Sequence, residues 1–459
     1  MSIEILEGNC LDTLKQLPDQ CVNTCITSPP YWGLRDYGTA TWIGGDPNCN
    51  HMRDSKVNPS GNTDTGHKAM FEKDNAVGDA IYKSECHKCG AKRKDQQLGL
   101  EDTPDQFVEN LVNVFREVRR VLKDDGTVWL NLGDSYHRSG SDQPTQKGML
   151  NTSGINEKYG WDHKHKNKLI NLKPKDLVGI PWKVAFGLQA DGWYLRQDII
   201  WHKPNPMPES VKDRCTKSHE YIFLLSKNAH YYFDHESIKV ESSQSTEIRN
   251  KNKFNGAFKG QFKGTPNEKR WQEGRPIDEP KFSIDGKSNK RSVWTVTTKP
   301  YSEAHFATYP HDLIIPCIKA GCPEKVCASC GESYVRGIES TRLKRNELSK
   351  NDPRYRPNTY EGTYKNINGK ADAGYTQTKD LGLQKQCQCE TNETKSGTVL
   401  DPFGGSGTTA QVAAQLNRNA IICELNPEYI KIANQRLLDS LGMFLDLKIT
   451  KPQTTENIK

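Results

Sequence analysis

The sequence predicts an α/β fold in which a mostly parallel sheet carries helices on both faces and polar insertions interrupt the core. One short apolar strand runs directly into DPFGGSGTT at residues 401–409, and another runs into TSPPYW at residues 27–32. A strand that leads through glycines into a helix is typical of such a sheet. The composition agrees, because 34% hydrophobic residues and a mean hydropathy of −0.81 in 459 residues indicate long polar segments around an adequate core.

The segment near the C-terminal end predicts a nucleoside-binding half-domain. A strand at residues 399–401 leads through a glycine turn into a helix at 410–416. The spacing of Gly405 and Gly407 fits a Rossmann-type turn, where missing side chains let a ligand lie against the backbone. A second short strand ends in Glu424, about 20 residues further on, where a carboxylate can bind ribose hydroxyls. A purely structural turn is the alternative, and the acid after the second strand favours the ligand site.

The segment near the N-terminal end adds chemistry to this half-domain. Pro29 and Pro30 fix two φ angles and remove two N–H donors, so the backbone here offers carbonyl acceptors. Acceptors suit an amino group. A base whose exocyclic NH2 donates to the Ser28 hydroxyl oxygen and the Pro29 carbonyl has its nitrogen lone pair drawn toward a methyl donor, and Tyr31 would stack on that base. A rigid turn with an aromatic plug is the alternative.

With these motifs the sequence resembles the amino-methylating DNA methyltransferases that use S-adenosylmethionine, in the permuted order where the catalytic motif precedes the cofactor motif. The other matching segments lie at residues 7–11, 115–131, 193–208, 218–224 and 305–310. Within 115–131, the resemblance implies a helix to 122, a turn at 123–126 and a strand at 127–131. It also implies a Rossmann-like methyltransferase core and a target base flipped out of the duplex toward the methyl sulfonium.

The resemblance assigns roles to particular residues. It implies catalytic roles for Ser28, Pro29, Pro30 and Tyr31. It implies cofactor contacts for Gly8, Asn9, Thr308, Asp401, Phe403, Gly405, Ser406, Gly407, Thr408 and Glu424. Asn9 stands where the family usually has Asp.

The neutral Ser28 favours cytosine as the target base. Many adenine-modifying relatives carry Asp here, and a carboxylate stabilises positive charge on the nitrogen as a hydroxyl cannot. N4 of cytosine is therefore the preferred target, and N6 of adenine stays the alternative because Ser also occurs among adenine enzymes. Two further alternatives are a zinc-containing DNA-binding protein with an inactive methyltransferase core and a methylase of RNA or protein, although related enzymes of the latter kind usually have Asn in place of Ser28.

The fourteen cysteines point to metal. No signal peptide or membrane span is evident, so we expect a cytoplasmic, DNA-associated protein whose thiols are reduced, and paired spacings then indicate metal ligands. Two structural zinc sites are predicted, one from Cys49, His51, Cys86 and Cys89, the other from Cys327, Cys330, Cys387 and Cys389. Unliganded thiols, or Cys322 and His87 as substitute ligands, are the alternatives. The remaining cysteines, Cys10, Cys21, Cys25, Cys215, Cys317 and Cys423, are expected in the core.

The charge favours a polyanionic partner. A net charge of +7 fits double-stranded DNA as the partner, with a cognate restriction endonuclease allowed but not required. Basic stretches lie at residues 163–168 and 248–263, and the second interleaves its cations with phenylalanines, as a DNA-facing loop would. Disorder is the alternative for this second stretch.

The motifs divide the chain into one core and several insertions. The core comprises residues 1–42 (the catalytic half), 101–134, 173–233, 293–320 and 396–442 (the cofactor-binding half). The insertions are 43–100 and 321–395 with one cysteine tetrad each, the loop 135–172, and 234–292, in the slot where the family places its target-recognition region. Residues 443–459 form a C-terminal tail.

Overall fold

The structure is a computed structural model, and it describes most of the expected core. The described residues are 1–33, 39–51, 85–137, 172–241, 287–298, 309–343, 375–442 and 446–451. Thr308, both basic stretches and most of the expected target-recognition region lie outside these ranges.

One nine-stranded sheet forms the centre of the molecule, in the order β10-β6-β7-β5-β2-β15-β16-β1-β17. Strand β7 is antiparallel to both of its neighbours, and the remaining pairs are parallel. The prediction of a mostly parallel α/β sheet is confirmed. The strands are β1 (Ser2–Glu7), β2 (Val22–Thr27), β5 (Leu122–Leu132), β6 (Tyr194–His202), β7 (His219–Ser226), β10 (Val293–Thr295), β15 (Thr398–Asp401), β16 (Asn419–Glu424) and β17 (Asp446–Thr450).

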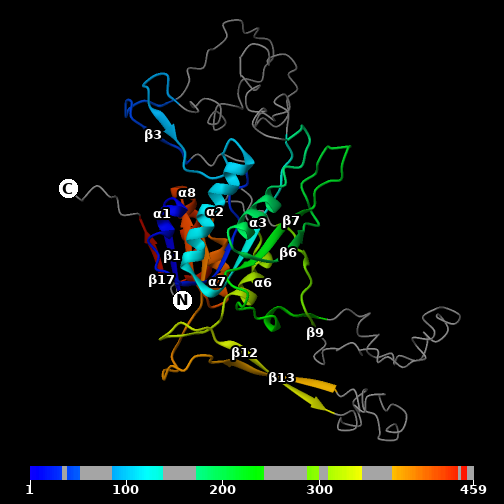
Figure 1. Ribbon diagram of the computed structural model, residues 1–459. Coiled ribbons are helices and arrows are strands. Elements are labelled where there is room, and N and C mark those ends of the chain that lie inside the picture. Colours follow the sequence, from blue (N-terminus) through cyan, green and yellow to red (C-terminus); the bar gives the residue numbers. More distant parts are fainter. Residues whose placement is uncertain are drawn as a thin grey trace, which may run out of the picture.

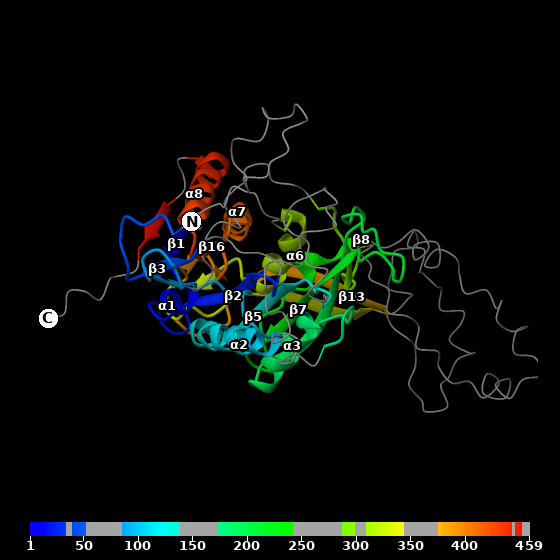
Figure 2. The same ribbon diagram turned by 90° about the horizontal axis from the view of Figure 1, so that it is seen from above.

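Helices cover both faces of this sheet, as Figure 2 shows. Apolar side chains of α1, α2 and α3 form one buried cluster with the sheet, and those of α6, α7 and α8 form the other. The helices are α1 (Cys10–Leu14), α2 (Pro104–Val121), α3 (Ile180–Ala190), α6 (His311–Gly321), α7 (Thr408–Gln415) and α8 (Pro427–Leu441). In the described part of the chain, no helix is long and apolar enough to span a membrane.

The junction of α2 and β5 agrees with the sequence prediction in part. The helix ends at Val121 and β5 starts earlier than predicted, at Leu122, but its pairing with β2 jumps from Leu122 (opposite Val22) to Thr127 (opposite Thr24). A Cβ at Gly126 would lie 2.4 Å from the Leu122 side chain and 2.9 Å from the Asn23 carbonyl. Residues four apart in an extended strand lie about 13 Å apart, so the chain bends back at the predicted turn, residues 123–126, and only glycine allows this close approach.

Smaller elements extend from the two ends of the sheet (Figure 1). They form two-stranded sheets that pair β3 with β4, β8 with β9, β11 with β14, and β12 with β13. Their bounds are β3 (Thr41–Ile43), β4 (Lys92–Lys94), η2 (Glu236–Ile238), β8 (Val240–Glu241), β9 (Lys287–Ser288), β11 (Val326–Cys327), β12 (Val335–Leu343), β13 (Tyr375–Gln384) and β14 (Thr394–Lys395).

The parallel strands give the sheet two distinct edges. β2 pairs in parallel with β15, with Thr24 opposite Val399 and Cys25 opposite Leu400. The loops that follow Thr27 and Asp401 therefore leave the sheet side by side, at what we call the carboxyl edge; the opposite one is the amino edge. The two sequence motifs lie together, as expected.

Most of the cysteines expected in the core are buried. Cys10, Cys25, Cys317 and Cys423 are buried, and Cys21 is half-buried. The prediction is wrong for Cys215, which is exposed in the loop between β6 and β7.

Candidate active site and metal clusters

Asp401 joins the two motifs at the carboxyl edge. Its buried carboxylate accepts hydrogen bonds from the Thr27 hydroxyl (2.6 Å) and the Phe403 amide (3.0 Å). The hydroxyls of Tyr309 (3.0 Å) and Thr409 (2.5 Å) donate to the other oxygen. Burial raises the pKa of Asp401 against these donors, which lower it. The carboxylate thus fixes the catalytic loop to the glycine turn, and its expected contact with a cofactor stays a prediction.

The glycine turn lies against the acid at the end of β16. Gly405 and Gly407 have φ angles of +51° and +77°, which other residues rarely adopt. The Gly405 amide donates to Glu424 Oε2 (2.7 Å), and the Asn426 amide donates to Glu424 Oε1 (2.8 Å). Burial raises the pKa of the Glu424 carboxyl to about 7, although both amides lower it. A carboxylate here is close to half-ionised near neutral pH.

Arg436 of α8 engages the side chains on the far side of this turn. Its Nη1 donates to Ser406 Oγ (3.0 Å) and Thr408 Oγ1 (2.9 Å). Both hydroxyls were expected to contact a cofactor, and in this structure both bind the arginine. Phe403 packs partly buried against the cluster beneath α2. Direct cofactor contacts of these three residues stay predictions.

Gly8 and Asn9 lie at the end of β1, next to β16. The Gly8 amide donates to the Glu424 carbonyl (2.8 Å), and Asn9 Oδ1 caps α1 by accepting from the Leu11 amide (2.9 Å). Beside them is a cavity of about 190 Å³. It is lined by Asn9, Cys10, Leu11, Gln96, Leu98, Asn110, Asn113 and Val114. The expected adenine-lining segment therefore borders an open space.

A polar network holds Ser28 and Tyr31 at the end of β2. The Tyr31 hydroxyl donates to Glu220 Oε2 (2.7 Å) and accepts from Asn131 Nδ2 (2.7 Å). Ser28 Oγ lies 3.3 Å from the Tyr31 hydroxyl and 3.3 Å from Asn131 Nδ2. Lys203 forms an ion pair with Glu220. Every partner of the Ser28 hydroxyl in this network is neutral, and the nearest charges pair with each other beyond Tyr31.

Two glycines allow the catalytic loop to pack closely. A Cβ on Gly133 would lie 2.5 Å from the Tyr31 ring, and a Cβ on Gly99 would lie 3.0 Å from the Tyr31 carbonyl. Pro29 is buried and Pro30 half-buried beneath this packing. The ring of Tyr31 is therefore fixed at its edge, and its expected stacking on a target base stays a prediction.

Sequence reasoning missed three residues of this network: Asn131, Glu220 and Lys203. Asn131 Oδ1 is also buried and has no hydrogen-bond partner among the described residues, which is unusual and costs about 1–3 kcal/mol when it persists. The signal was present, because Asn131 interrupts the apolar run at residues 128–132 of β5 and Glu220 directly precedes the apolar run at 221–225 of β7. Only the antiparallel pairing of β5 with β7 shows that both face Ser28.

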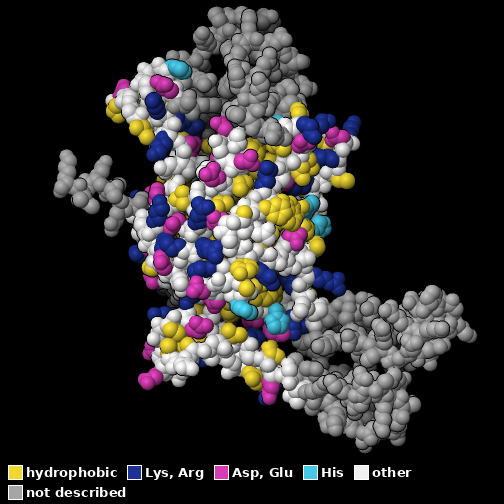
Figure 3. Space-filling view, viewed as in Figure 1, with side chains coloured by type: hydrophobic (Ala, Val, Ile, Leu, Met, Phe, Trp, Pro, Cys, Tyr) yellow, Lys and Arg dark blue, Asp and Glu magenta, His cyan; other side chains and the backbone are white. Residues whose placement is uncertain are grey.

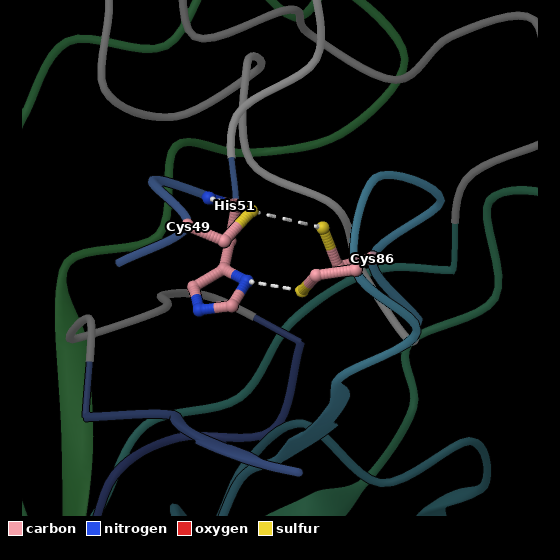
Figure 4. A group of neighbouring side chains, drawn as sticks. Cys49, His51 and Cys86 are labelled. Carbon is pink, nitrogen blue, oxygen red and sulfur yellow. Dashed lines mark hydrogen bonds between the residues drawn. The ribbon is translucent and has the colours of Figure 1, made fainter. Parts of the chain in front are cut away.

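The first predicted tetrad is assembled, and Figure 4 labels three of its members, Cys49, His51 and Cys86. The ligand atoms of Cys49, His51, Cys86 and Cys89 all lie within 4.8 Å of one another. Cys49 and Cys86 Sγ are 3.7 Å apart, and Cys89 Sγ is 3.5 Å from His51 Nδ1. For bonds of about 2.3 Å to sulfur and 2.0–2.1 Å to nitrogen, a tetrahedral zinc ion requires about 3.8 and 3.5 Å. The donor set and its dimensions therefore fit zinc.

The second tetrad is assembled as well. The sulfurs of Cys327, Cys330, Cys387 and Cys389 lie within 4.8 Å of one another, a donor set typical of structural zinc. The turn from Cys327 to Gly331 closes with a 2.9 Å hydrogen bond from the Gly331 amide to the Cys327 carbonyl. The proposed substitute ligands belong to neither tetrad, since Cys322 is buried beside α6 and His87 is exposed.

Known proteins resemble this chain over most of its length. The N6/N4 methyltransferase family model, described as DNA methylase, matches residues 22–328 and 342–435. Type II methyltransferase M.Cfr9I of Citrobacter freundii is 32% identical over 435 residues, which are 94% of this chain and 87% of that protein. Type II methyltransferase M.SmaI of Serratia marcescens is 32% identical over 445 residues, 95% of this chain and 91% of that protein.

Two solved structures give broad but loose superpositions. PvuII DNA methyltransferase (cytosine-N4-specific) has 13% identity, covers 96% of this chain and 88% of its own, and gives a TM-score of 0.43. The complex of M1.HpyAVI with SAM has 12% identity, coverages of 95% and 100%, and a TM-score of 0.35.

The range that the family model matches and the two relatives define the class of the protein. The chain belongs to the N6/N4 family of DNA methylases. The expected resemblance to amino-methylating DNA methyltransferases is confirmed.

Removing the Thr27 hydroxyl should weaken the contact between the two motifs, because this hydroxyl donates to Asp401. In Thr27→Val the buried Asp401 loses one donor, so we expect the free energy of unfolding to fall by about 1.5–3 kcal/mol, as for a hydrogen bond to a charged group. Thr27→Ser keeps the hydroxyl and should lose less than half as much. Urea titrations of both variants measure this, and equal losses would show that the hydrogen bond contributes nothing.

Purified protein should contain two zinc ions per chain. Replacing Cys86 and Cys89 by Ser should remove one ion, and replacing Cys327 and Cys330 should remove the other, because each tetrad loses two of its four ligands. Elemental analysis by mass spectrometry gives the stoichiometry. Well under one zinc per chain in the unmodified protein contradicts both sites.

Proposed function

We propose that this chain transfers a methyl group from S-adenosylmethionine to N4 of a cytosine flipped out of double-stranded DNA inside the cell. The observation that supports the base is the neutral environment of Ser28, whose hydroxyl lies between Asn131 and Tyr31 and has no direct carboxylate partner among the residues that the structure describes. An adenine amino group, the alternative target, would benefit more from a carboxylate at this position.

The residues at the carboxyl edge suit the proposed cofactor. The Glu424 carboxylate keeps lone pairs beyond those taken by two amides, so it can accept ribose hydroxyls. A Cβ on Gly405 would meet no atom within 4 Å in the described part of the chain, which leaves room for a ligand against the turn. Asn9 borders the cavity suited to the adenine ring. When bound, the cofactor supplies a methyl group activated on a sulfonium.

The protein's own part in the reaction is positioning and proton removal. The Ser28 hydroxyl oxygen and the Pro29 carbonyl accept the two amino hydrogens of the base, which directs the nitrogen lone pair at the methyl group. The methylated nitrogen must then lose a proton. The hydrogen bonds from Ser28 through Tyr31 lead to the Glu220 carboxylate, which can accept that proton.

The relatives support a role in protecting DNA from a restriction endonuclease. Both are named Type II methyltransferases, so we propose that the methylated sites are those of a Type II restriction endonuclease. An inactive, DNA-binding core is the remaining candidate, and the assembled Ser28 network speaks against it.

The product decides the function. Expression in cells that lack DNA methylation, followed by mass spectrometry of digested DNA, should yield N4-methylcytosine. N6-methyladenine would keep the enzyme class and reverse the base. If folded protein yields neither methylated nucleoside, the proposal is refuted.

Ser28→Ala should lower the rate of methyl transfer by at least about 100-fold, the usual effect of losing one such hydrogen-bonding group in a transition state. Cofactor binding should persist, because the hydrogen bonds of the Glu424 and Gly405 region do not include Ser28. Single-turnover methylation and calorimetry measure the two effects. Ser333→Ala, which removes a buried hydroxyl at the amino edge, is the control and should leave the rate unchanged.

Cofactor affinity should rise with pH through neutrality. Only ionised Glu424 offers all its lone pairs to ribose hydroxyls, and burial raises its pKa to about 7. As pH falls below that value the carboxyl becomes protonated, so the dissociation constant should increase by up to about tenfold per pH unit. Calorimetry between pH 5.5 and 8.5 tests this. Glu424→Gln should bind weakly at every pH, and a retained pH dependence would exclude Glu424 as its source.

A further inference from the structure

The first zinc-binding insertion belongs to the active-site edge of the sheet. It leaves the catalytic loop and returns to it, with the Gly33 amide donating to the Gly99 carbonyl (2.8 Å) and Trp32 Nε1 donating to the Glu101 carbonyl (2.9 Å). The insertion also supplies Gln96 and Leu98 to the cavity beside Asn9. Its hairpin therefore projects from the same end of the sheet as the loop that carries Ser28 (Figure 1, β3).

The second tetrad lies at the opposite edge. Lys123, at the start of β5, donates to the Gly331 carbonyl, and Ser333 donates to Asp125 (2.8 Å). Figure 1 shows β12 and β13 at the end of the molecule away from β3. The segment 234–292 is also attached at this edge, because β7 ends there and β10 begins there. Its role in target recognition stays a prediction, and its attachment points lie away from Ser28.

The hairpin of β3 and β4 is held by the first tetrad and carries a basic strand. The Trp42 ring of β3 stacks on the ligand His51, with centroids 4.3 Å apart. Trp42 is opposite Arg93, which pairs with Asp95 at 3.5 Å. The two lysines on either side of Arg93 in β4, Lys92 and Lys94, are exposed. Figure 3 shows Lys and Arg side chains on this part of the surface, at the upper left.

Such a hairpin requires its metal. Strands of three residues are too short to be stable alone, and the hairpin contributes few buried apolar side chains. A zinc ion that links Cys49 and His51, after β3, to Cys86 and Cys89, before β4, fixes both strands. The two exposed lysines then project from one strand about 7 Å apart, as residues two positions apart do.

From these observations we propose that the zinc-held hairpin, residues 39–51 and 85–100, is an arm that binds the phosphate backbone of the target duplex through Lys92 and Lys94. The ligand is a polyanion because the exposed groups are ammonium ions at the edge where the base must enter. The inference rests on the proposed function, since it takes the substrate of the Ser28 site to be DNA. The arm contributes affinity and orientation rather than sequence reading.

The test removes the two charges and keeps the metal. The double variant Lys92→Ser with Lys94→Ser should bind a random duplex of about 30 base pairs about tenfold or more weakly near 0.1 M salt. The slope of log affinity against log salt should fall in magnitude by about 1.8, which corresponds to two lost phosphate contacts. Fluorescence anisotropy at several salt concentrations measures both. Zinc content and cofactor affinity should match those of the unmodified protein.

The matched control removes two exposed lysines at the other edge. Lys379→Ser with Lys395→Ser has the same net charge change and should leave affinity and slope close to those of the unmodified protein. Equal losses in both double variants, or none in the first, would overturn the proposal. A second variant, Cys86→Ser with Cys89→Ser, should lose one zinc ion and weaken duplex binding similarly, and unchanged binding after the loss of that zinc also counts against the arm.

The proposed function is assessed separately, by methylated nucleosides from the unmodified protein. If these form while the lysine variant binds DNA normally, only the arm is refuted. If none form, the proposed function fails, and the anisotropy result still reports whether the hairpin binds DNA.

Discussion

The parallel pairing of β2 with β15 is the constraint on which the active site depends. It brings together two loops that are separated by 374 positions at Thr27 and Asp401, and the hydrogen bond between these residues closes the joint. Asp401 is buried with its charge surrounded by donors, which is how a protein tolerates an anion in its core. The same carboxylate also accepts hydrogen bonds from Tyr309 and Thr409, so one buried group holds the helix after the glycine turn and the end of β2 together.

The chemistry of the site follows from how charge is distributed around Ser28. Glu220 and Lys203 form a pair beyond Tyr31, so within the described ranges the serine hydroxyl meets only the neutral side chains of Tyr31 and Asn131. Asn131 can donate two hydrogens, yet three oxygens lie within reach of its Nδ2, so its hydrogen bonds must be shared among them. Its carbonyl oxygen remains available in the same buried space. A flipped base would enter a network that still has an acceptor to offer.

The two metal clusters show that similar ligand sets serve different parts of a fold. Both lie in polar insertions that contribute little apolar surface, where a bound metal ion would replace the missing hydrophobic core. The first insertion begins after a strand that ends at the carboxyl edge, and the second joins α6 to a strand that begins at the amino edge. Strand direction therefore places one cluster at the carboxyl edge, where the active site lies, and the other at the amino edge.

The sequence by itself determined the features that depend on neighbouring residues. Thr103 capping α2, the glycine turn after β15 and the acid at the end of β16 are all local, and both ligand tetrads were recognisable from paired spacings within reduced, polar segments. Only the tertiary structure decided which distant residues face Ser28 and which edge each insertion occupies. Asn131 and Glu220 are brought to Ser28 by strand pairing. Such contacts depend on register and strand direction across the whole sheet, which no local pattern specifies.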